Sequence, residues 1–409
     1  MGDAPKLGAN ALRYRPFVCY WLATWAIGFA VQIMSVAVAW QIYDITRDPL
    51  ALGFVGLAQF LPPLALVLLT GLAADRFNRR LIMGACLAVE TLCAACLLAF
   101  TLAAPASVLP VYSILVVLGT ARAFLNPAAD ALAPNLVPKE AIAHGISLNS
   151  MSWQVANIAG PVAGGLLYGI AGEAAYSAAV LLVAAAAMLI AMTGPVPQAE
   201  ASGETSLSSL FAGFAFIRRE RVVLGAISLD LFAVLLGGAV ALMPIFARDI
   251  LDVGPWGLGL LRAAPGAGAI LVTLYLVKFG IRDHAGKLLF IFVAGFGLAT
   301  AVFGLSTALP LSVAALAAVG ACDMVNVYIR EILLQLWTPD EVRGRVNAVN
   351  RVFLGASNEL GEFRAGVVAA MTGAVIATAA GGLGTMLVAG LWARWFPELR
   401  TARRLDGRS

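Results

Sequence analysis

Charged residues are scarce in this chain. Asp, Glu, Lys and Arg make up 12% of its 409 residues, whereas hydrophobic residues make up 61%. Soluble domains carry roughly 25% charged residues, because their surfaces face water. The composition therefore excludes an ordinary soluble domain and predicts an integral membrane protein.

Residues typical of catalytic and metal sites are also few. Only His144 and His284 are present, and they lie far apart in the sequence. Cys93 and Cys96 form a C-x-x-C pair, but it lies in an apolar stretch without a second pair, which favours a packing role. The sequence contains no phosphate-binding loop, nucleophile elbow or zinc-protease motif. We therefore expect no enzymatic activity, no metal and no cofactor.

Long apolar runs recur along the whole chain. A bilayer core takes about 20 apolar residues per helix, and hydropathy indicates about a dozen such segments. We place them at 17–43, 50–72, 81–103, 108–133, 142–170, 174–194, 222–247, 256–277, 288–306, 311–334, 346–371 and 373–395. The predicted fold class is an all-α integral membrane protein with about 12 transmembrane helices.

Basic residues fall mainly in alternate loops between these segments. If the first helix starts inside, the outer side receives little beyond Arg47 and Arg248. The positive-inside rule then places both termini in the cytoplasm. The net charge of +4 reflects this topology, so we expect no nucleic-acid partner. The first apolar run is long enough to span, so we expect no cleaved signal peptide.

A polar break between Pro195 and Arg221 divides six segments from six. It predicts an N-terminal six-helix bundle over 1–194, a cytoplasmic linker over 195–221, and a C-terminal six-helix bundle with a cytoplasmic tail over 222–409. The second half of the linker carries apolar residues at helical spacing ahead of three arginines. This pattern predicts an amphipathic helix on the inner membrane surface.

The two predicted bundles share a repeated pattern. At an offset of 201 residues the chain aligns Gly119 with Gly320, Pro138 with Pro339, Asn149 with Asn350, Asn157 with Asn358 and Gly160 with Gly361. These matches are glycine, proline and asparagine rather than alanine and leucine, which are the most abundant residues here, so composition alone does not explain the match. We infer two pseudo-symmetric halves, with substrate bound between them near the bilayer midplane.

The same offset pairs Arg122 with Asp323, each halfway along a predicted span. A charge at the bilayer centre is costly unless it faces a cavity or a partner. Asn326 and Arg330 follow Asp323 by three and seven residues, which puts the three on one helix face. We expect this face to line the central cavity, with Arg122 and Arg330 near an anionic substrate group. A structural ion pair is the alternative.

Further acidic residues lie inside predicted spans. The stretch SNELGEFRAG places Glu359 and Glu362 one turn apart, and Asp230 and Glu90 lie in the seventh and third segments. A carboxylate in a low-dielectric site has a raised proton affinity, which can couple a proton gradient to transport. Asp323, Asp230, Glu359 and Glu362 are therefore candidate proton carriers. Each, and Glu90 above all, has a tie between helices as its alternative role.

Two short motifs resemble signatures of the major facilitator superfamily. GLAADRFNRR, with Gly71, Asp75, Arg76, Arg79 and Arg80, is similar to the G-x-L-A-D-R-x-x-R-R signature of the loop between the second and third helices. In that family this loop forms a charge relay that stabilises the outward-open state. A simple positive-inside anchor would explain the arginines but not Asp75.

The second motif, GPVAGG, lies in the fifth predicted helix and contains Gly160, Pro161, Gly164 and Gly165. It resembles the G-x-x-x-G-P-x-x-G-G motif of proton-coupled exporters, with Ala156 in place of the upstream glycine. The resemblance implies an antiporter. Close helix packing with no bearing on transport direction is the alternative.

Longer stretches narrow the resemblance. WQIYDITRDPLALGFVGLAQFLPP, ARAFLNPAADALAPNLVP and TPDEVRGRVNAVN look like the enterobactin-exporter-like, or transmembrane secretion effector, branch of the superfamily. This resemblance implies proton-coupled export of a small amphiphilic molecule, such as a siderophore or a drug-like compound. It also implies a monomer in the bacterial inner membrane.

Two other functions remain open. A lipid or lysophospholipid flippase of the same fold is not separated from an exporter by the sequence. A non-transporting sensor or scaffold is disfavoured, because no soluble output domain is present and the buried charges would have no purpose.

Overall fold

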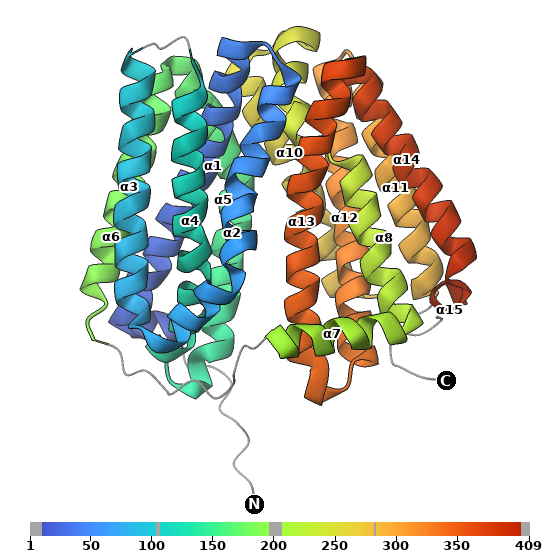
Figure 1. The fold of residues 1–409 in the computed structure, drawn as a ribbon, viewed down its shortest axis with the longest axis horizontal. Coiled ribbons are helices and arrows are strands. Elements are labelled where there is room, and N and C mark those ends of the chain that lie inside the picture. Colours follow the sequence, from blue (N-terminus) through green and yellow to red (C-terminus); the bar gives the residue numbers. More distant parts are fainter. Residues whose placement is uncertain (1–9, 104–106, 196–206, 282–283, 402–409) are drawn as a thin grey trace, which may run out of the picture. The chain divides into compact units, whose positions relative to one another are not determined.

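The computed structural model describes residues 10–103, 107–195, 207–281 and 284–401. These residues are almost all helical, and no strand occurs among them (Figure 1). The side chains of Leu68, Asp75, residues 207–212, Asp340 and Glu341 also lie outside the described part.

Six long helices make up the first half of the chain. They are α1 (Arg15–Thr46), α2 (Pro49–Arg76), α3 (Arg79–Ala103), α4 (Leu109–Leu132), α5 (Ile142–Ile170) and α6 (Gly172–Met192). A short 3₁₀ turn, η1 (Ala11–Arg13), precedes α1. Two further 3₁₀ turns join α4 to α5, namely η2 (Ala133–Leu136) and η3 (Lys139–Ala141).

The second half begins with α7 (Leu207–Arg219) in the predicted linker. The later helices are α8 (Arg221–Gly237), α10 (Gly254–Phe279), α11 (Ala285–Leu305), α12 (Leu309–Trp337), α13 (Asp340–Thr372), α14 (Ala374–Trp395) and the short α15 (Pro397–Thr401). Ten described segments are long and apolar enough to cross a membrane. With the more polar α5 and α13 they make twelve, which agrees with the predicted number and places.

The seventh predicted span is not one unbroken α-helix. It consists of α8, the 3₁₀ turn η4 (Val240–Leu242), the short α9 (Met243–Ile245) and a π-helical turn η5 (Phe246–Ile250). The break begins at Gly238, directly after Gly237, and Pro244 follows six residues later. Glycine and proline are the weakest helix formers, which explains a break that hydropathy alone does not show.

The chain divides into two compact units. Unit 1 comprises Met1–Gln41 and Leu61–Thr205, and unit 2 comprises Ile42–Phe60 and Ser206–Ser409. The end of α1 and the start of α2 therefore belong with the second unit. The domain bounds drawn from the sequence stay a prediction.

Small residues bring helices close together in both units. In unit 2, Gly268 of α10 lies against the backbone of Ala317 in α12, and Gly320 of α12 lies against the backbone of Pro265 in α10. Such reciprocal contacts leave no room for a side chain at either glycine. They fit association in lipid, where helices gain stability mainly from close packing.

The predicted amphipathic helix is present as α7, and it packs on the chain itself. Ile217 is 2% exposed and joins a cluster with Val223, Leu334 and Val346. Gly213 meets the backbone of Arg345 in α13, whereas Arg218 and Arg219 are exposed. Through Gly213 and Ile217, α7 therefore packs on the start of α13, and its arginines are exposed. That α7 lies on the inner membrane surface stays a prediction.

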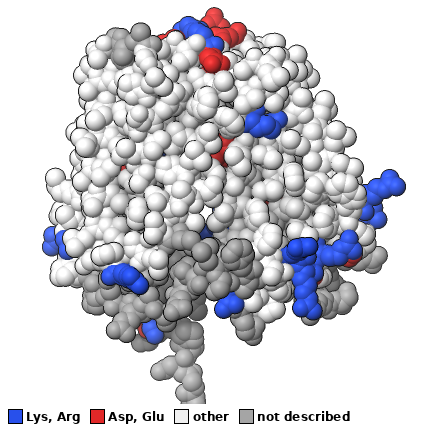
Figure 2. Space-filling model, viewed as in Figure 1, with Lys and Arg blue, Asp and Glu red and all other residues white. Residues whose placement is uncertain are grey.

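Charged side chains are sparse on the face of the molecule drawn in Figure 2. Most of those visible lie toward the ends of the helices, and the surface between is almost entirely uncharged. This distribution is expected of a protein whose middle faces lipid.

Candidate functional site

A buried polar cluster joins α8 to α12 in unit 2. Arg330 forms an ion pair with Asp230, and the amide of Asn326 donates a hydrogen bond of 2.5 Å to the same carboxylate. The three residues are 2%, 3% and 4% exposed. Such a pair needs further hydrogen bonds to offset the loss of water, and Asn326 supplies one.

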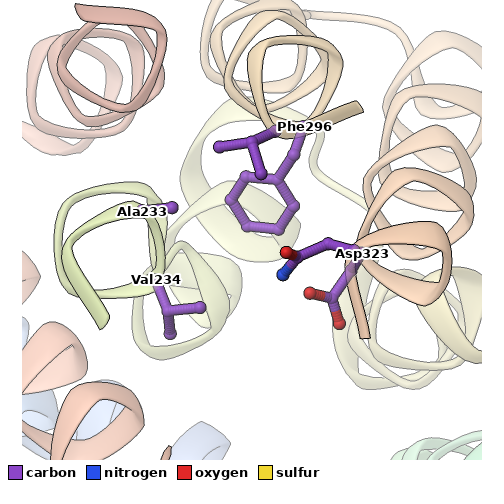
Figure 3. Close-up of a pocket in the computed structure, with 6 residues that line it drawn as sticks. Ala233, Val234, Phe296 and Asp323 are labelled. Carbon is purple, nitrogen blue, oxygen red and sulfur yellow. The ribbon is translucent and has the colours of Figure 1, made fainter. Parts of the chain in front are cut away.

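Asp323 lies one turn before Asn326 on the same helix and lines a small pocket. Ala233 and Val234 of α8, Val293 and Phe296 of α11, and Asn326 complete the lining. Figure 3 shows the ring of Phe296 between Ala233 and the α12 backbone that carries Asp323. Asp323 and Asn326 thus border a pocket within unit 2, and Arg330 is not among its lining residues. That the shared face of the three residues lines a central cavity stays a prediction.

The predicted pair Glu359 and Glu362 forms a second polar cluster. A Cβ placed on Gly56 of α2 would lie 2.9 Å from Oε2 of Glu359 and 3.4 Å from Oε2 of Glu362. Both carboxylates therefore converge on Gly56. Arg262 of α10 interacts electrostatically with Glu362, so this cluster contains two acids and one base.

Arg262 was missed in the sequence reasoning. It lies within the span predicted at 256–277, so the rule that a charge inside a membrane span is costly would also have selected it. A further cluster was also missed, at the ends of α1 and η5. There Arg248 lies 2.5 Å from Asp44, Arg47 lies 3.4 Å from Asp249, and Tyr43 hydrogen-bonds Asp249.

Arg364, also in SNELGEFRAG, has a structural task. Its Nη2 donates a 2.6 Å hydrogen bond to the carbonyl of Leu236. That carbonyl lies at the end of α8, where the helix break removes its ordinary partner. Arg364 thereby satisfies backbone left open by the Gly237–Gly238 break.

Arg122 of α4 faces Glu90 of α3 in unit 1. Their charged atoms lie 3.7 Å apart, and Glu90 is fully buried. Arg122 and Arg330, both predicted to meet an anionic substrate group, are thus each paired with an acid of their own unit. The alternative of a tie between helices fits Glu90.

The arginines of the loop after α2 cap helix ends. Arg79 donates to the carbonyls of Ala74 (3.1 Å) and Ala131 (3.2 Å), and Arg80 donates to those of Ile190 (3.2 Å) and Ala191. These carbonyls belong to the last turns of α2, α4 and α6, where cations are favoured. Of the other residues of this motif, Gly71 lies within α2 and Arg76 is exposed. The side chain of Asp75 lies outside the described part. The charge relay stays a prediction.

The motif in α5 makes the contact between α5 and α1. Gly160, Pro161, Gly164 and Gly165 are all buried. A Cβ on Gly160 would lie 2.6 Å from Cβ of Gln32, and one on Gly164 would lie 2.9 Å from Cα of Ile33. Ala156, which replaces the motif's upstream glycine, packs against Gly28 of α1. The missing glycine of one helix is thus matched by a glycine on the other.

Comparison with known proteins gives the family. The family model described as transmembrane secretion effector matches residues 8–407. The chain belongs to this family of the major facilitator superfamily. It is therefore a multi-pass membrane transporter, as the two short motifs and the longer stretches predicted.

Related sequences and structures agree with this assignment. The enterobactin exporters EntS of Shigella boydii serotype 18 and of Escherichia coli O1:K1 are each 26% identical over 417 residues, covering 97% of this chain and 96% of theirs.

Among solved structures, a bacterial homologue of the human lysosomal transporter Spinster matches with a TM-score of 0.73 and 15% identity, covering 97% of this transporter and 100% of the homologue. A POT family transporter in complex with 5-aminolevulinic acid matches with a TM-score of 0.74 and 11% identity. The match covers 94% of this transporter and 96% of the POT family transporter. At these identities the structures show the fold alone.

Proposed function

We propose that this transporter exports a small amphiphilic molecule in exchange for protons, by alternating access. The observation that carries the proposal is the position of Asp323. This residue lies on the membrane-spanning helix α12 and its carboxylate lines a pocket, whereas Arg330 of the same helix is paired with Asp230. The exporter function of the relatives at 26% identity supports the direction.

The cluster suggests how the roles divide. Asp230, Asn326 and Arg330 hold one another and fix α8 against α12. Asp323 borders the pocket, where it can bind and release a proton as access changes from one side to the other. Glu359 and Glu362 are the second candidates for this role, with Arg262 beside them.

The remaining features of the proposal follow from topology and family. Both termini face the cytoplasm of a bacterium, the protein lies in the inner membrane, and it works as a monomer driven by the proton gradient. The basic loops on one side support the orientation.

The experiment uses inverted membrane vesicles that contain the protein and are energised to acidify their lumen. Catecholate siderophores and lipophilic amines are added in turn while a dye reports lumenal pH. The proposal predicts proton efflux triggered by at least one compound, and no such efflux with Asp323→Asn. Asp252→Asn is the matched control, because Asp252 is an exposed acid outside the pocket.

Two outcomes would contradict the proposal. Equal efflux from the wild type and Asp323→Asn would move the coupling role to Glu359 and Glu362. A lack of response to every compound, together with movement of labelled lysolipid between leaflets, would favour the flippase.

A further inference from the structure

Helices α11 and α14 of unit 2 pack side by side and run in opposite directions (Figure 1). Gly297 of α11 lies against the backbone of Gly382 in α14, and Gly304 lies against the backbone of Ala379. The contact position in α14 thus falls as the position in α11 rises. Carried to the other end of the pair, this antiparallel register puts the start of α11 beside the end of α14.

The two neighbouring helix ends each carry an exposed basic side chain. In this register Lys287, near the start of α11, lies level with Arg394, near the end of α14. Both helix ends are also ends of candidate membrane spans, so the two cations lie at one membrane boundary. Trp395, the last residue of α14, is 55% exposed, and tryptophan is enriched at this level of a membrane.

The short helix α15 brings a third cation to the same place. Leu399 is fully buried in the cluster formed by α8, α11 and α14, which holds α15 against them. A Cβ on Gly286 of α11 would lie 3.1 Å from the carbonyl oxygen of Arg400, so Arg400 is close to Lys287 in space. The side chain of Arg400 is exposed.

These three cations are not balanced by acidic side chains. Glu398 of α15 is paired with Arg221 at 2.9 Å, and that pair is neutral as a whole. Within the described part of the chain, Lys287, Arg394 and Arg400 form no ion pair. Basic side chains gathered between helices at a membrane boundary attract the phosphate of an anionic lipid.

Toward the middle of the membrane, each helix continues the basic position as an apolar face. Exposed apolar residues lie four and eleven positions after Lys287, and three and seven positions before Arg394, which puts them on the same helix faces as the cations. They are Ile291 and Leu298 of α11, and Leu391 and Leu387 of α14. The order of a charged end followed by hydrocarbon surface matches that of a phospholipid, in which acyl chains follow the headgroup.

We propose that Lys287, Arg394 and Arg400 form a headgroup site for an anionic phospholipid of the surrounding membrane. Lys287 and Arg394 contact the phosphate, and the acyl chains lie along the apolar faces of α11 and α14. A zwitterionic phospholipid carries its own ammonium group beside the phosphate, so it gains less from the three cations. The headgroup site shares no residue with the pocket at Asp323, and it is independent of the proposed transport function.

Native mass spectrometry of the purified full-length transporter in detergent tests the headgroup site. Dioleoyl phosphatidylglycerol, dioleoyl phosphatidylcholine and inorganic phosphate are titrated separately. We expect phosphatidylglycerol to bind about tenfold more tightly than phosphatidylcholine, because several basic residues face its anionic headgroup. Inorganic phosphate should form no stable complex, since it has no acyl chains to lie along α11 and α14.

A double variant removes two of the cations. Lys287→Gln with Arg394→Gln keeps exposed polar side chains and should lower the affinity for phosphatidylglycerol to that for phosphatidylcholine. Arg13→Gln with Lys139→Gln is the matched control, because it removes one arginine and one lysine from exposed positions of unit 1. The control should bind phosphatidylglycerol as the wild type does. Each variant is first checked for a monodisperse peak in size-exclusion chromatography.

Three results would overturn the proposal. The first is equal binding of the two lipids, or binding of inorganic phosphate as tight as that of phosphatidylglycerol. The second is unchanged binding of phosphatidylglycerol by the variant at Lys287 and Arg394. The third is an equal loss of binding in the control variant, which would show a response to net charge alone.

Discussion

Arg330 is 2% exposed, and the carboxylate that balances its charge comes from Asp230 on the adjacent helix. Glu90 is fully buried beside Arg122 in the same way. A buried charge left without its partner is strongly unfavourable, whereas removal of both members of a pair is often tolerated. At the scale of single residues, the buried charges should therefore respond to substitution as pairs.

Asp230→Asn should destabilise the protein by about 3 kcal/mol, because Arg330 would remain buried with only the more distant carboxylate of Glu331, 3.7 Å away, as its ion-pair partner. The double variant Asp230→Leu with Arg330→Met should recover most of this loss. Thermal unfolding in detergent, followed by size-exclusion chromatography, measures the change. As a control, Glu398→Gln breaks the exposed pair with Arg221 and should have little effect. A double variant no more stable than Asp230→Asn would contradict the pairing.

Arg122→Ala should likewise lower stability, since the carboxylate of Glu90 would stay buried without its partner, beside the space that the arginine side chain had filled. Adding Glu90→Gln should restore the melting temperature, because a neutral amide replaces the charge. Transport is then assayed in the stable double variant, which separates a tie between helices from a substrate contact. A single variant that is as stable as the wild type would show that the Glu90 contact is not important for folding.

Helix pairs are held by glycines that allow backbone contact. Gly320 of α12 lies against Pro265 of α10, whereas a Cβ on Gly390 of α14 would meet nothing within 4 Å. Alanine is the better helix former by roughly 1 kcal/mol, so the two positions should respond in opposite directions. At the scale of elements, alanine should therefore stabilise a helix only where its methyl group does not meet the backbone of a neighbouring helix.

Gly320→Ala should lower the melting temperature, because its methyl group would overlap the carbonyl of Pro265 and force α10 and α12 apart. Gly390→Ala should leave it unchanged or raise it slightly. Both variants are compared by thermal unfolding in the same detergent. A stable Gly320→Ala protein would mean that α10 and α12 are not packed as closely as described.

Much of the whole molecule was predictable from the sequence. Apolar runs placed twelve segments, and the spacing of Asp323, Asn326 and Arg330 gave their shared helix face. Hydropathy did not reveal the break after Gly237, because apolar composition continues through it. Partners such as Glu90 for Arg122 were also beyond reach, since the register between two helices depends on packing that one sequence does not encode in any short pattern.

The central claim concerns the whole transporter: Asp323 couples proton movement to export. The direct measurement compares uphill accumulation with passive equilibration in proteoliposomes, at saturating concentration of a compound identified in the vesicle experiment. We predict that the wild type accumulates the compound against its gradient when a pH gradient is imposed. Asp323→Asn should equilibrate the compound across the membrane without accumulating it. Accumulation by Asp323→Asn to the wild-type level would contradict the account.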